Sequence, residues 1–308
     1  MTALAPLAPA PLAAALDAVL DLMEAEGMRL RVWSVVISFF GDAVAHRGGV
    51  IRLSALQEIT ERLRLEPGAL RTAMSRLARD GWLTRDRRGR ASYYALTPQK
   101  QVETEAAALR IYAPPMAALG PHAPDGWTLA LAPDPAAAEP GLRALGFGAL
   151  EGGGWLGPAA ALRAACALPG VSAAAIRANG AHLVPGLIGA AWGAPGAAER
   201  TEDALRLLAP LDAALTAPPE VKTPLGRRDA AAARCLTIHL WRRAALRAPQ
   251  PPAGLIPADW RTEDARDMAA RIHAHLSPDA EAWLSACDGA PDGPMPLAGQ
   301  AAMRRFGV

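Results

Sequence analysis

The stretch LRTAMSRLARDGWLTRDRRGRASYYALT, from Leu70 to Thr97, is the most informative part of this 308-residue sequence. Its first half has helical spacing, with about 100° of rotation per residue. One face of this helix is apolar and holds Leu70, Ala73, Met74, Leu77 and Ala78. The opposite face carries no carboxylate and holds Arg71, Thr72, Ser75, Arg76 and Arg79. A helix that only needs to stay soluble usually mixes both signs of charge on its exposed face, so this pattern indicates an anion-binding surface.

The second half of the stretch predicts a β-hairpin in which Trp82–Asp86 pairs with Ala91–Leu96. Arg87, Arg88 and Arg90 then gather at one turn around Gly89. Charge runs at turns are usually solvated surface, and that is the alternative interpretation. Between Leu65 and Thr97, however, the net charge is +4, whereas the whole chain carries only +2. The positive charge is therefore local, as at a site for a polyanion.

The two tyrosines after this turn, Tyr93 and Tyr94, point to opposite faces if the segment is a strand. We expect one ring in the core, and the other, assigned to Tyr93, toward DNA or solvent.

The residues before this stretch complete a familiar order of elements. Helical spacing predicts a leading helix after an Ala/Pro-rich tail within residues 1–28, and a second helix ending near Gly41-Asp42. A short strand at Val50–Leu53 precedes a helix whose Ser54 and Gln57 have capping-box spacing, and Pro67 suits the start of the next helix. Helix, strand, helix, turn, helix and basic hairpin together predict a winged helix-turn-helix DNA-binding domain at residues 29–98.

The rest of the chain predicts a linker helix and two further domains. The linker occupies residues 99–117. Strands alternating with helices, from Trp127 to a last strand at Ala181–Ile188, predict a small α/β sandwich domain at residues 118–190. Helical periodicity then predicts a C-terminal helical domain at residues 191–308, with helices at 198–215, 227–246, 262–276 and 278–286. The expected fold class is α+β.

Several kinds of chemistry find no support in the sequence. Cys166, Cys235 and Cys287 have neither metal-ligand spacing nor an even number for disulfides, and His273 and His275 lie on different faces of a predicted helix. No nucleophile elbow, phosphate loop or dinucleotide fingerprint occurs. We therefore expect no catalytic residues, no metal, no cofactor and no enzyme. The chain also lacks a signal peptide or an apolar run of about 18 residues, which predicts a cytoplasmic protein without a membrane partner.

Four blocks of sequence resemble one family, the PaaX-like transcriptional regulators, which repress phenylacetic acid catabolism. The blocks are ISFFGDAVAHRGG (Ile37–Gly49), the stretch Leu70–Thr97, GLRALGFGAL (Gly141–Leu150) and IHLWRRAALRAPQPPAGLIPADW (Ile238–Trp260). The resemblance implies a homodimeric repressor with a winged helix, a ferredoxin-like central domain and a C-terminal helical domain. It also implies binding to a palindromic double-stranded operator and release by an aryl-CoA thioester effector, typically phenylacetyl-CoA.

Site residues follow from these expectations. Arginine's planar fork suits both guanine edges and phosphate oxygens, so we assign the polar face of the Leu70 helix to DNA and Arg87, Arg88 and Arg90 to its backbone. For the effector, the candidate contacts are Arg234, Trp241, Arg242 and Arg243, together with Arg247, because arginines hold phosphates bidentately and an aromatic ring can stack.

Three alternatives stay open at this point. Arg242 or Arg243 could instead form an ion pair with Asp259 or Asp264, which would make this cluster structural. The winged helix could bind protein rather than DNA. An enzyme acting on CoA thioesters is the third alternative.

Overall fold

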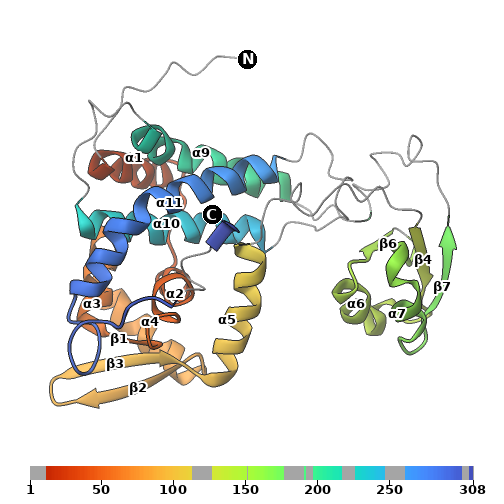
Figure 1. The fold of residues 1–308 in the computed structure, drawn as a ribbon, viewed down its shortest axis with the longest axis horizontal. Helices are drawn as coiled ribbons and strands as arrows, with labels where there is room; N and C mark the ends of the chain where they lie inside the picture. The colour runs from red at the N-terminus through yellow and green to blue at the C-terminus, as the bar shows by residue number, and fades with distance from the viewer. Residues whose placement is uncertain are drawn as a thin grey trace. The chain divides into compact units, whose positions relative to one another are not determined.

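A computed structural model describes residues 12–112, 127–150, 152–176, 191, 197–216, 226–246, 261–299 and 305–307. They fall into two compact units. The first unit comprises the described parts of Met1–Ala113, Glu202–Leu246 and Asp264–Val308, and the second those of Pro114–Thr201 and Arg247–Glu263. The fold is α+β, as predicted, with a small antiparallel sheet in each unit (Figure 1).

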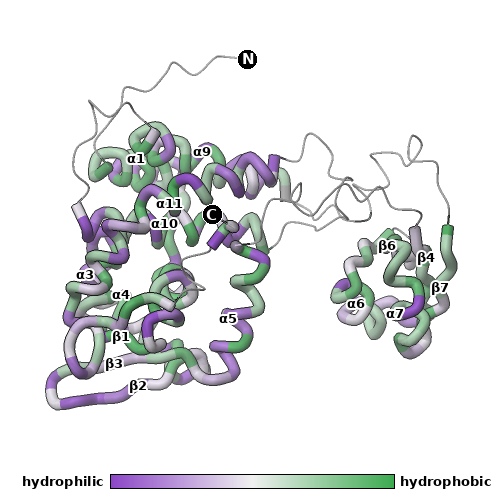
Figure 2. Tube along the Cα trace, in the orientation of Figure 1, coloured by the Kyte–Doolittle hydropathy of each residue, from purple (hydrophilic) through white to green (hydrophobic). Residues whose placement is uncertain are grey.

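The first unit contains the elements around the decisive stretch. Strands β1 (Val50–Arg52), β3 (Ala91–Leu96) and β2 (Leu83–Arg88) form an antiparallel sheet in the order β1-β3-β2. Helices α3 (Leu53–Arg62) and α4 (Pro67–Arg79) pack against each other, and α4 contacts β2. Strand β2 begins with the buried Leu83 and is hydrophilic toward the hairpin turn (Figure 2), and it extends two residues beyond the predicted end, to Arg88. The turn is correspondingly tight, and Gly89 has a φ of +60°, a conformation that glycine adopts without strain.

The predicted capping box is wrong. Helix α3 begins at Leu53 with Arg52 as its N-cap residue, so Ser54 already lies inside the helix and no side chain caps it. Gln57 instead donates to the Glu61 carboxylate one turn later, at 2.6 Å. Pro67 does begin α4, as predicted.

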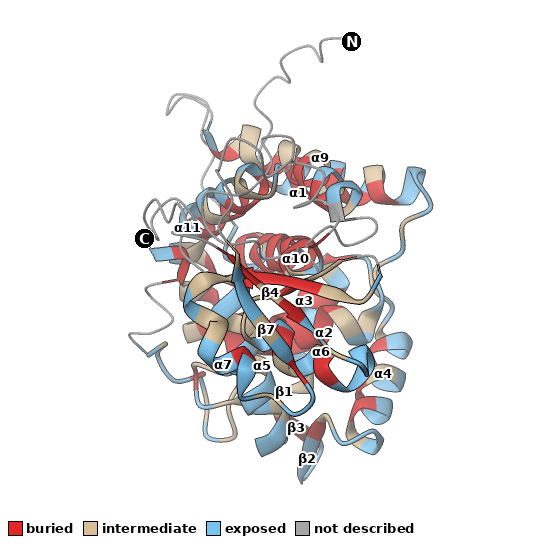
Figure 3. Ribbon diagram, turned by 90° about the vertical axis from the view of Figure 1, so that its right-hand side faces the viewer, coloured by how far each residue is buried: buried red, intermediate tan, exposed pale blue. Residues whose placement is uncertain are grey.

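Helix α10 (Arg227–Ala245) lies in the core of the first unit. Every residue from Ala230 to Trp241 is buried (Figure 3), and α10 contacts α1 (Leu12–Ala25), α2 (Val32–Phe39) and α3. A helix that is buried all round must be surrounded by other elements. The C-terminal helices therefore share a core with the N-terminal elements, which differs from the separate domain expected at residues 191–308. Helix α5 (Pro98–Ile111), predicted as a linker, also packs against α10 and β3.

Two further helices depart from the predicted boundaries. Helix α2 does not end at Gly41-Asp42 but continues as a π-helical turn, η1 (Phe40–Val44). Helix α11 (Thr262–Ala286) runs through Pro278, where a break between two helices was predicted. Proline has no amide hydrogen, so Pro278 cannot donate to the Ala274 carbonyl. The first unit also contains α9 (Ala197–Thr216) from Glu202 onward, and the short η5 (Arg305–Gly307).

The second unit has the element order β-α-β-β-α-β in its described residues. These are β4 (Trp127–Leu131), α6 (Pro135–Ala144), β5 (Gly148–Ala149), β6 (Gly154–Pro158), α7 (Leu162–Cys166) and β7 (Ser172–Ile176). The sheet order is β5-β6-β4-β7 and every pair is antiparallel. The helices cover a small core that includes Leu142, Phe147 and Trp155. Strand β7 was not predicted, and the predicted strand Ala181–Ile188 lies outside the described residues.

Candidate functional site

The polar face of α4 is exposed as the sequence predicted. The side chains of Leu70, Met74 and Leu77 are buried, which turns the opposite face outward. That face holds the exposed residues Arg71, Thr72, Ser75, Arg76 and Arg79. The side chains of Arg76 and Arg79 are 66% and 77% exposed, so both guanidinium groups can reach a ligand in solution.

One carboxylate that lies beside this face was not predicted from the sequence. Asp80, the C-cap residue of α4, lies 3.3 Å from Arg76 Nε and 3.5 Å from Arg79 Nε. The signal was present, because Arg76 and Asp80 are four residues apart and so are neighbours on a helix surface. Arg71, in contrast, has no hydrogen-bond or ion-pair partner among the described residues.

The hairpin presents four exposed arginines. Arg85 donates to the Ser92 hydroxyl at 2.9 Å, and the three arginines at the turn have different surroundings. Arg88 Nε lies 2.9 Å from the Asp86 carboxylate, and its Nη1 lies 3.7 Å from Asp292. Arg87 donates to the Gly89 carbonyl at 3.3 Å. Arg90 has no partner within the described part of the chain. Surface pairs of this kind contribute little energy, so these arginines stay available to an external anion.

The expectation that one tyrosine faces outward is wrong. The Tyr93 and Tyr94 residues are 6% and 4% exposed. Strand β3 lies between β1 and β2, and on each face an arginine of β2 lies over a ring: Arg88 is 6.0 Å from the Tyr93 ring and Arg85 is 5.9 Å from the Tyr94 ring. Tyr93 therefore offers little surface to DNA, and the arginine above it is the exposed group.

The predicted effector cluster does not converge on one site. Trp241 is buried and its indole N–H donates to the Ile111 carbonyl at 2.8 Å. Arg242 donates to the Ser34 carbonyl at 3.0 Å and to its hydroxyl at 2.6 Å, and burial lowers the pKa of its guanidinium. Arg242 is thus held by Ser34 rather than by Asp264, and Arg243 is exposed. Asp259 and Arg247 lie outside the described residues.

A buried ionic network that the sequence did not predict surrounds Asp42, in the π-helical turn. Its carboxylate lies 2.9 Å from Arg234 Nε, accepts from the Tyr112 hydroxyl at 2.7 Å, and also contacts His273 and Arg305. Burial alone would raise the pKa of Asp42, but Arg234, Arg305 and His273 outweigh it and hold the pKa well below its usual value. The charged Asp42 therefore joins η1, α10, α11 and the C-terminal end.

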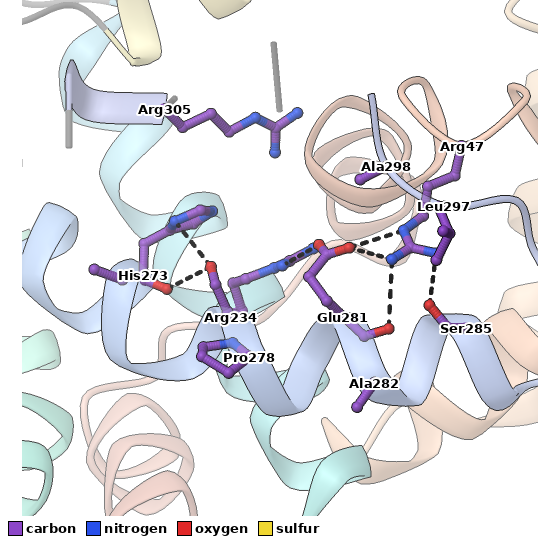
Figure 4. Close-up of a pocket in the computed structure, with 12 residues that line it drawn as sticks. Arg47, Arg234, His273, Pro278, Glu281, Ala282, Ser285, Leu297, Ala298 and Arg305 are labelled. Atoms are coloured by element: carbon purple, nitrogen blue, oxygen red, sulfur yellow. Dashed lines mark hydrogen bonds and ion pairs between the residues drawn. The ribbon is translucent and has the colours of Figure 1, made fainter. Parts of the chain in front are cut away.

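A cavity of about 700 Å³ lies beside this network (Figure 4). Glu281 of α11 lies between two arginines: its carboxylate accepts from Arg234 Nη1 at 2.6 Å and pairs with Arg47. Arg47 also donates to the Ser285 hydroxyl at 3.2 Å. Of the predicted effector residues that the structure describes, Arg234 alone lines this cavity.

The described residues contain no group of histidine, cysteine and acidic side chains that could hold a metal ion. Within the same part of the chain, no helix is both long enough and apolar enough to cross a bilayer.

Two family profiles match the chain. The PaaX-like protein profile matches residues 31–100, and the PaaX-like protein C-terminal domain profile matches residues 198–286. The chain belongs to the PaaX-like family. The first PaaX-like match contains α4 and the hairpin, and the second contains α10, α11 and all but the first residue of α9.

A named PaaX relative and one solved structure are similar to the chain. The transcriptional repressor PaaX of Escherichia coli (strain K12) is 29% identical over 298 residues, which cover 89% of each chain. This relative is named as a repressor and not as an enzyme. The solved structure is that of the uncharacterized protein Rv0674 from Mycobacterium tuberculosis, which is 22% identical, with coverage of 75% of this chain and 90% of that chain and a TM-score of 0.44.

Proposed function

We propose that this PaaX-like protein is a transcriptional repressor that binds double-stranded operator DNA through a winged helix-turn-helix at residues 29–98. One observation carries the proposal: the exposed, arginine-rich face of α4 lies on a helix that contacts the arginine-rich hairpin β2–β3. The name of the Escherichia coli relative supports the repressor role.

The proposed DNA contacts divide into two kinds. Helix α4 serves as the recognition helix in the major groove, where Arg71 and Arg76, with Thr72, Ser75 and Arg79, reach base edges and phosphates. The hairpin is the wing, and Arg87, Arg88 and Arg90 contact the DNA backbone. Phosphate contacts position a protein on DNA and base contacts specify the sequence, so the two groups are distinguishable by experiment.

The repressor acts as a homodimer on a palindromic operator. A dimer places its two recognition helices in half-sites about 34 Å apart, or a multiple of that distance. The order of elements in the second unit, β-α-β-β-α-β, supports a ferredoxin-like central domain.

The effector is an aryl-CoA thioester such as phenylacetyl-CoA, in keeping with the family resemblance. Helix α10 shares one core with α2 and α3, so a ligand that shifts the C-terminal helices can alter the position of α4. Coupling of this kind is reciprocal, so saturating operator must weaken effector binding by the same factor as effector weakens operator binding.

Selection from a pool of random-sequence duplexes with the full-length protein tests the DNA-binding proposal. The selected duplex is then titrated by fluorescence anisotropy at salt concentrations from about 50 to 200 mM. We expect a steep fall of affinity with salt, because arginines that neutralise phosphates release counterions. Failure to enrich any duplex, or binding that does not depend on salt, would instead favour a module that binds protein.

The effector proposal is tested on the same complex. Phenylacetyl-CoA should release the full-length protein from the selected duplex, whereas phenylacetate and CoA should not. The full chain is required because α10 is buried against α1, α2 and α3, so a C-terminal fragment would expose the core. Release by phenylacetate as well as by the thioester, or by neither, would contradict this choice of effector.

A further inference from the structure

The cavity beside Asp42 carries more positive than negative charge in its immediate surroundings. The guanidinium groups of Arg47, Arg234 and Arg305 face the carboxylates of Asp42 and Glu281, which leaves one positive charge among these described residues. His273 does not add a second one at neutral pH, because burial lowers its pKa below the ordinary value. An uncompensated positive charge in a partly buried site favours an anion.

One nitrogen of the Arg234 guanidinium donates no hydrogen bond to the described residues. Its side chain is 3% exposed, its Nε donates to Asp42, and its Nη1 donates to Glu281. Its Nη2 donates to none of the described residues, and Arg234 lines the cavity. Nη2 can therefore donate to a ligand oxygen in the cavity, and a charge-assisted hydrogen bond of this kind is stronger than one between neutral groups.

The cavity also has an apolar lining. Ala274, Pro278, Ala282 and Ala298 line it together with Leu297, whose residue is 79% exposed. An isolated exposed leucine is ordinary on a protein surface, but this one lies beside an arginine-lined cavity whose volume suits a small molecule. A ligand with an apolar body would cover it.

From this geometry we propose that the cavity binds a small organic anion, whose carboxylate or phosphate group is held by Arg234 and whose apolar body lies against Leu297 and the alanines of α11. The first test titrates the full-length protein with benzoate, phenyl phosphate and benzamide by isothermal calorimetry. Both anions should bind saturably, and the neutral amide should bind at least about tenfold more weakly. The tighter of the two anions identifies the preferred head group. Absence of binding by both anions, or binding of benzamide as tight as that of the tighter anion, would overturn the proposal.

Variants place the binding at this cavity. Arg234→Gln should abolish anion binding, but this residue also belongs to the buried network. Leu297→Glu changes an exposed residue and brings a negative charge to the cavity, so it should weaken benzoate binding about tenfold or more. Leu109→Glu on α5 is a matched control, because Leu109 is also 79% exposed and does not line the cavity. Unchanged affinity in Leu297→Glu, or an equal loss in both glutamate variants, would place the ligand elsewhere.

The residues 287–299 connect this cavity to the proposed DNA surface. Leu297 and Ala298 line the cavity, while the Gly289 carbonyl accepts from the Arg52 amide at 2.7 Å and Asp292 lies 3.7 Å from Arg88 of the hairpin. A ligand that moves this segment changes the distance of a carboxylate from a hairpin arginine. We therefore expect benzoate or phenyl phosphate, whichever binds, to change the affinity for the selected duplex without releasing the protein from it, because release is proposed only for the thioester.

This last expectation rests on the proposed function and has its own readout. Anisotropy of the DNA complex is measured with and without saturating anion, in the wild type and in Asp292→Asn. Loss of the effect in Asp292→Asn supports the connection through Asp292. If the anion binds but DNA affinity stays constant, the site stands and the connection fails. If no duplex is bound at all, the proposed function fails, while the calorimetric result is unaffected.

Discussion

At the scale of single residues, Arg71 and Arg76 are the side chains best placed to read a base. Both are exposed on α4, and Arg71 has no competing partner among the described residues. Replacing either arginine by alanine should cost about 1–3 kcal/mol of operator affinity, the usual loss for a bidentate arginine–guanine contact. Anisotropy titration of the selected duplex measures this loss.

The matched control for these variants is Arg243→Ala. It removes the same charge from an exposed position on α10, outside α4 and the hairpin, and should leave DNA affinity unchanged. Wild-type affinity in both α4 variants would remove the recognition role from this helix. An equal loss in the control would show that only net charge matters.

Arg90 differs from the α4 arginines because it is predicted to contact phosphate. It is exposed in the hairpin turn and has no partner among the described residues, whereas Arg88 is already paired with Asp86. Arg90→Ala should weaken binding to all duplexes alike and flatten the slope of log affinity against log salt by about one unit. Arg88→Ala should have the smaller effect. A changed sequence preference with an unchanged slope would show that Arg90 reads bases instead.

At the scale of elements, the π-helical turn η1 places Asp42 inside the core. Removal of this carboxylate charge by Asp42→Asn leaves Arg305 and part of Arg234 without a counter-charge in a buried site. Breaking a buried ion pair in this way typically costs about 3–5 kcal/mol. Urea denaturation should therefore show a free energy of unfolding lowered by about that amount.

Asp212→Asn is the appropriate comparison for this variant. Asp212 lies 2.9 Å from Arg271, whose side chain is 48% exposed, and such surface pairs contribute about 0–1 kcal/mol. If Asp42→Asn lowers the free energy of unfolding no more than Asp212→Asn does, water must already compensate the charges around η1.

The same elements show what local sequence pattern can and cannot predict. The two faces of α4 follow from the spacing of Leu70, Met74 and Leu77, because a helix presents residues three and four apart on one side. From the sequence alone, Asp42 is predicted only to lie at the end of a helix. Its ionic partners Arg234 and Arg305 lie about two hundred residues or more further along the chain. No spacing rule connects such positions.

The predicted effector residues do not lie together at one site, for a related reason. Trp241, Arg242 and Arg243 are adjacent in sequence, but on a helix successive side chains are about 100° apart and point in different directions. The prediction that the Tyr93 ring is exposed was wrong for a different reason. Alternation along a strand predicts which face of the sheet a ring occupies, but it does not predict that another side chain, here Arg88, lies over that face.

At the scale of the whole molecule, a shared core means that the C-terminal helices and the proposed DNA-binding elements unfold together. Helix α10 brings His239 into this core, where its Nδ1 lies 3.0 Å from the Ser38 hydroxyl of α2. Burial, together with the nearby charges of Arg242 and Arg243, lowers the pKa of His239 to about 3 from an ordinary value of 6.5. Burial also lowers the pKa of His273.

These lowered values predict how stability depends on pH. Below pH 6.5 the unfolded chain binds a proton at residue 239 that the folded protein does not bind until about pH 3, so stability is complete above pH 6.5 and falls as the pH decreases. Between about pH 7 and pH 5, His239 alone should remove about 2 kcal/mol from the free energy of unfolding, and His273 adds to the loss. The pKa values of Asp42 and Glu281 are lowered below those of ordinary carboxyls, so both groups remain charged throughout this range.

Urea denaturation at the two pH values, in the wild type and in His239→Gln, measures this contribution. The variant should lose about 2 kcal/mol of the pH-dependent change, whatever its stability at neutral pH, because glutamine does not titrate. His275→Gln changes an exposed histidine of α11 and should keep the wild-type dependence. If His239→Gln instead retained the full loss between the two pH values, the folded protein would have to bind a proton at residue 239 near neutral pH, and the core around α10 would have to open to water.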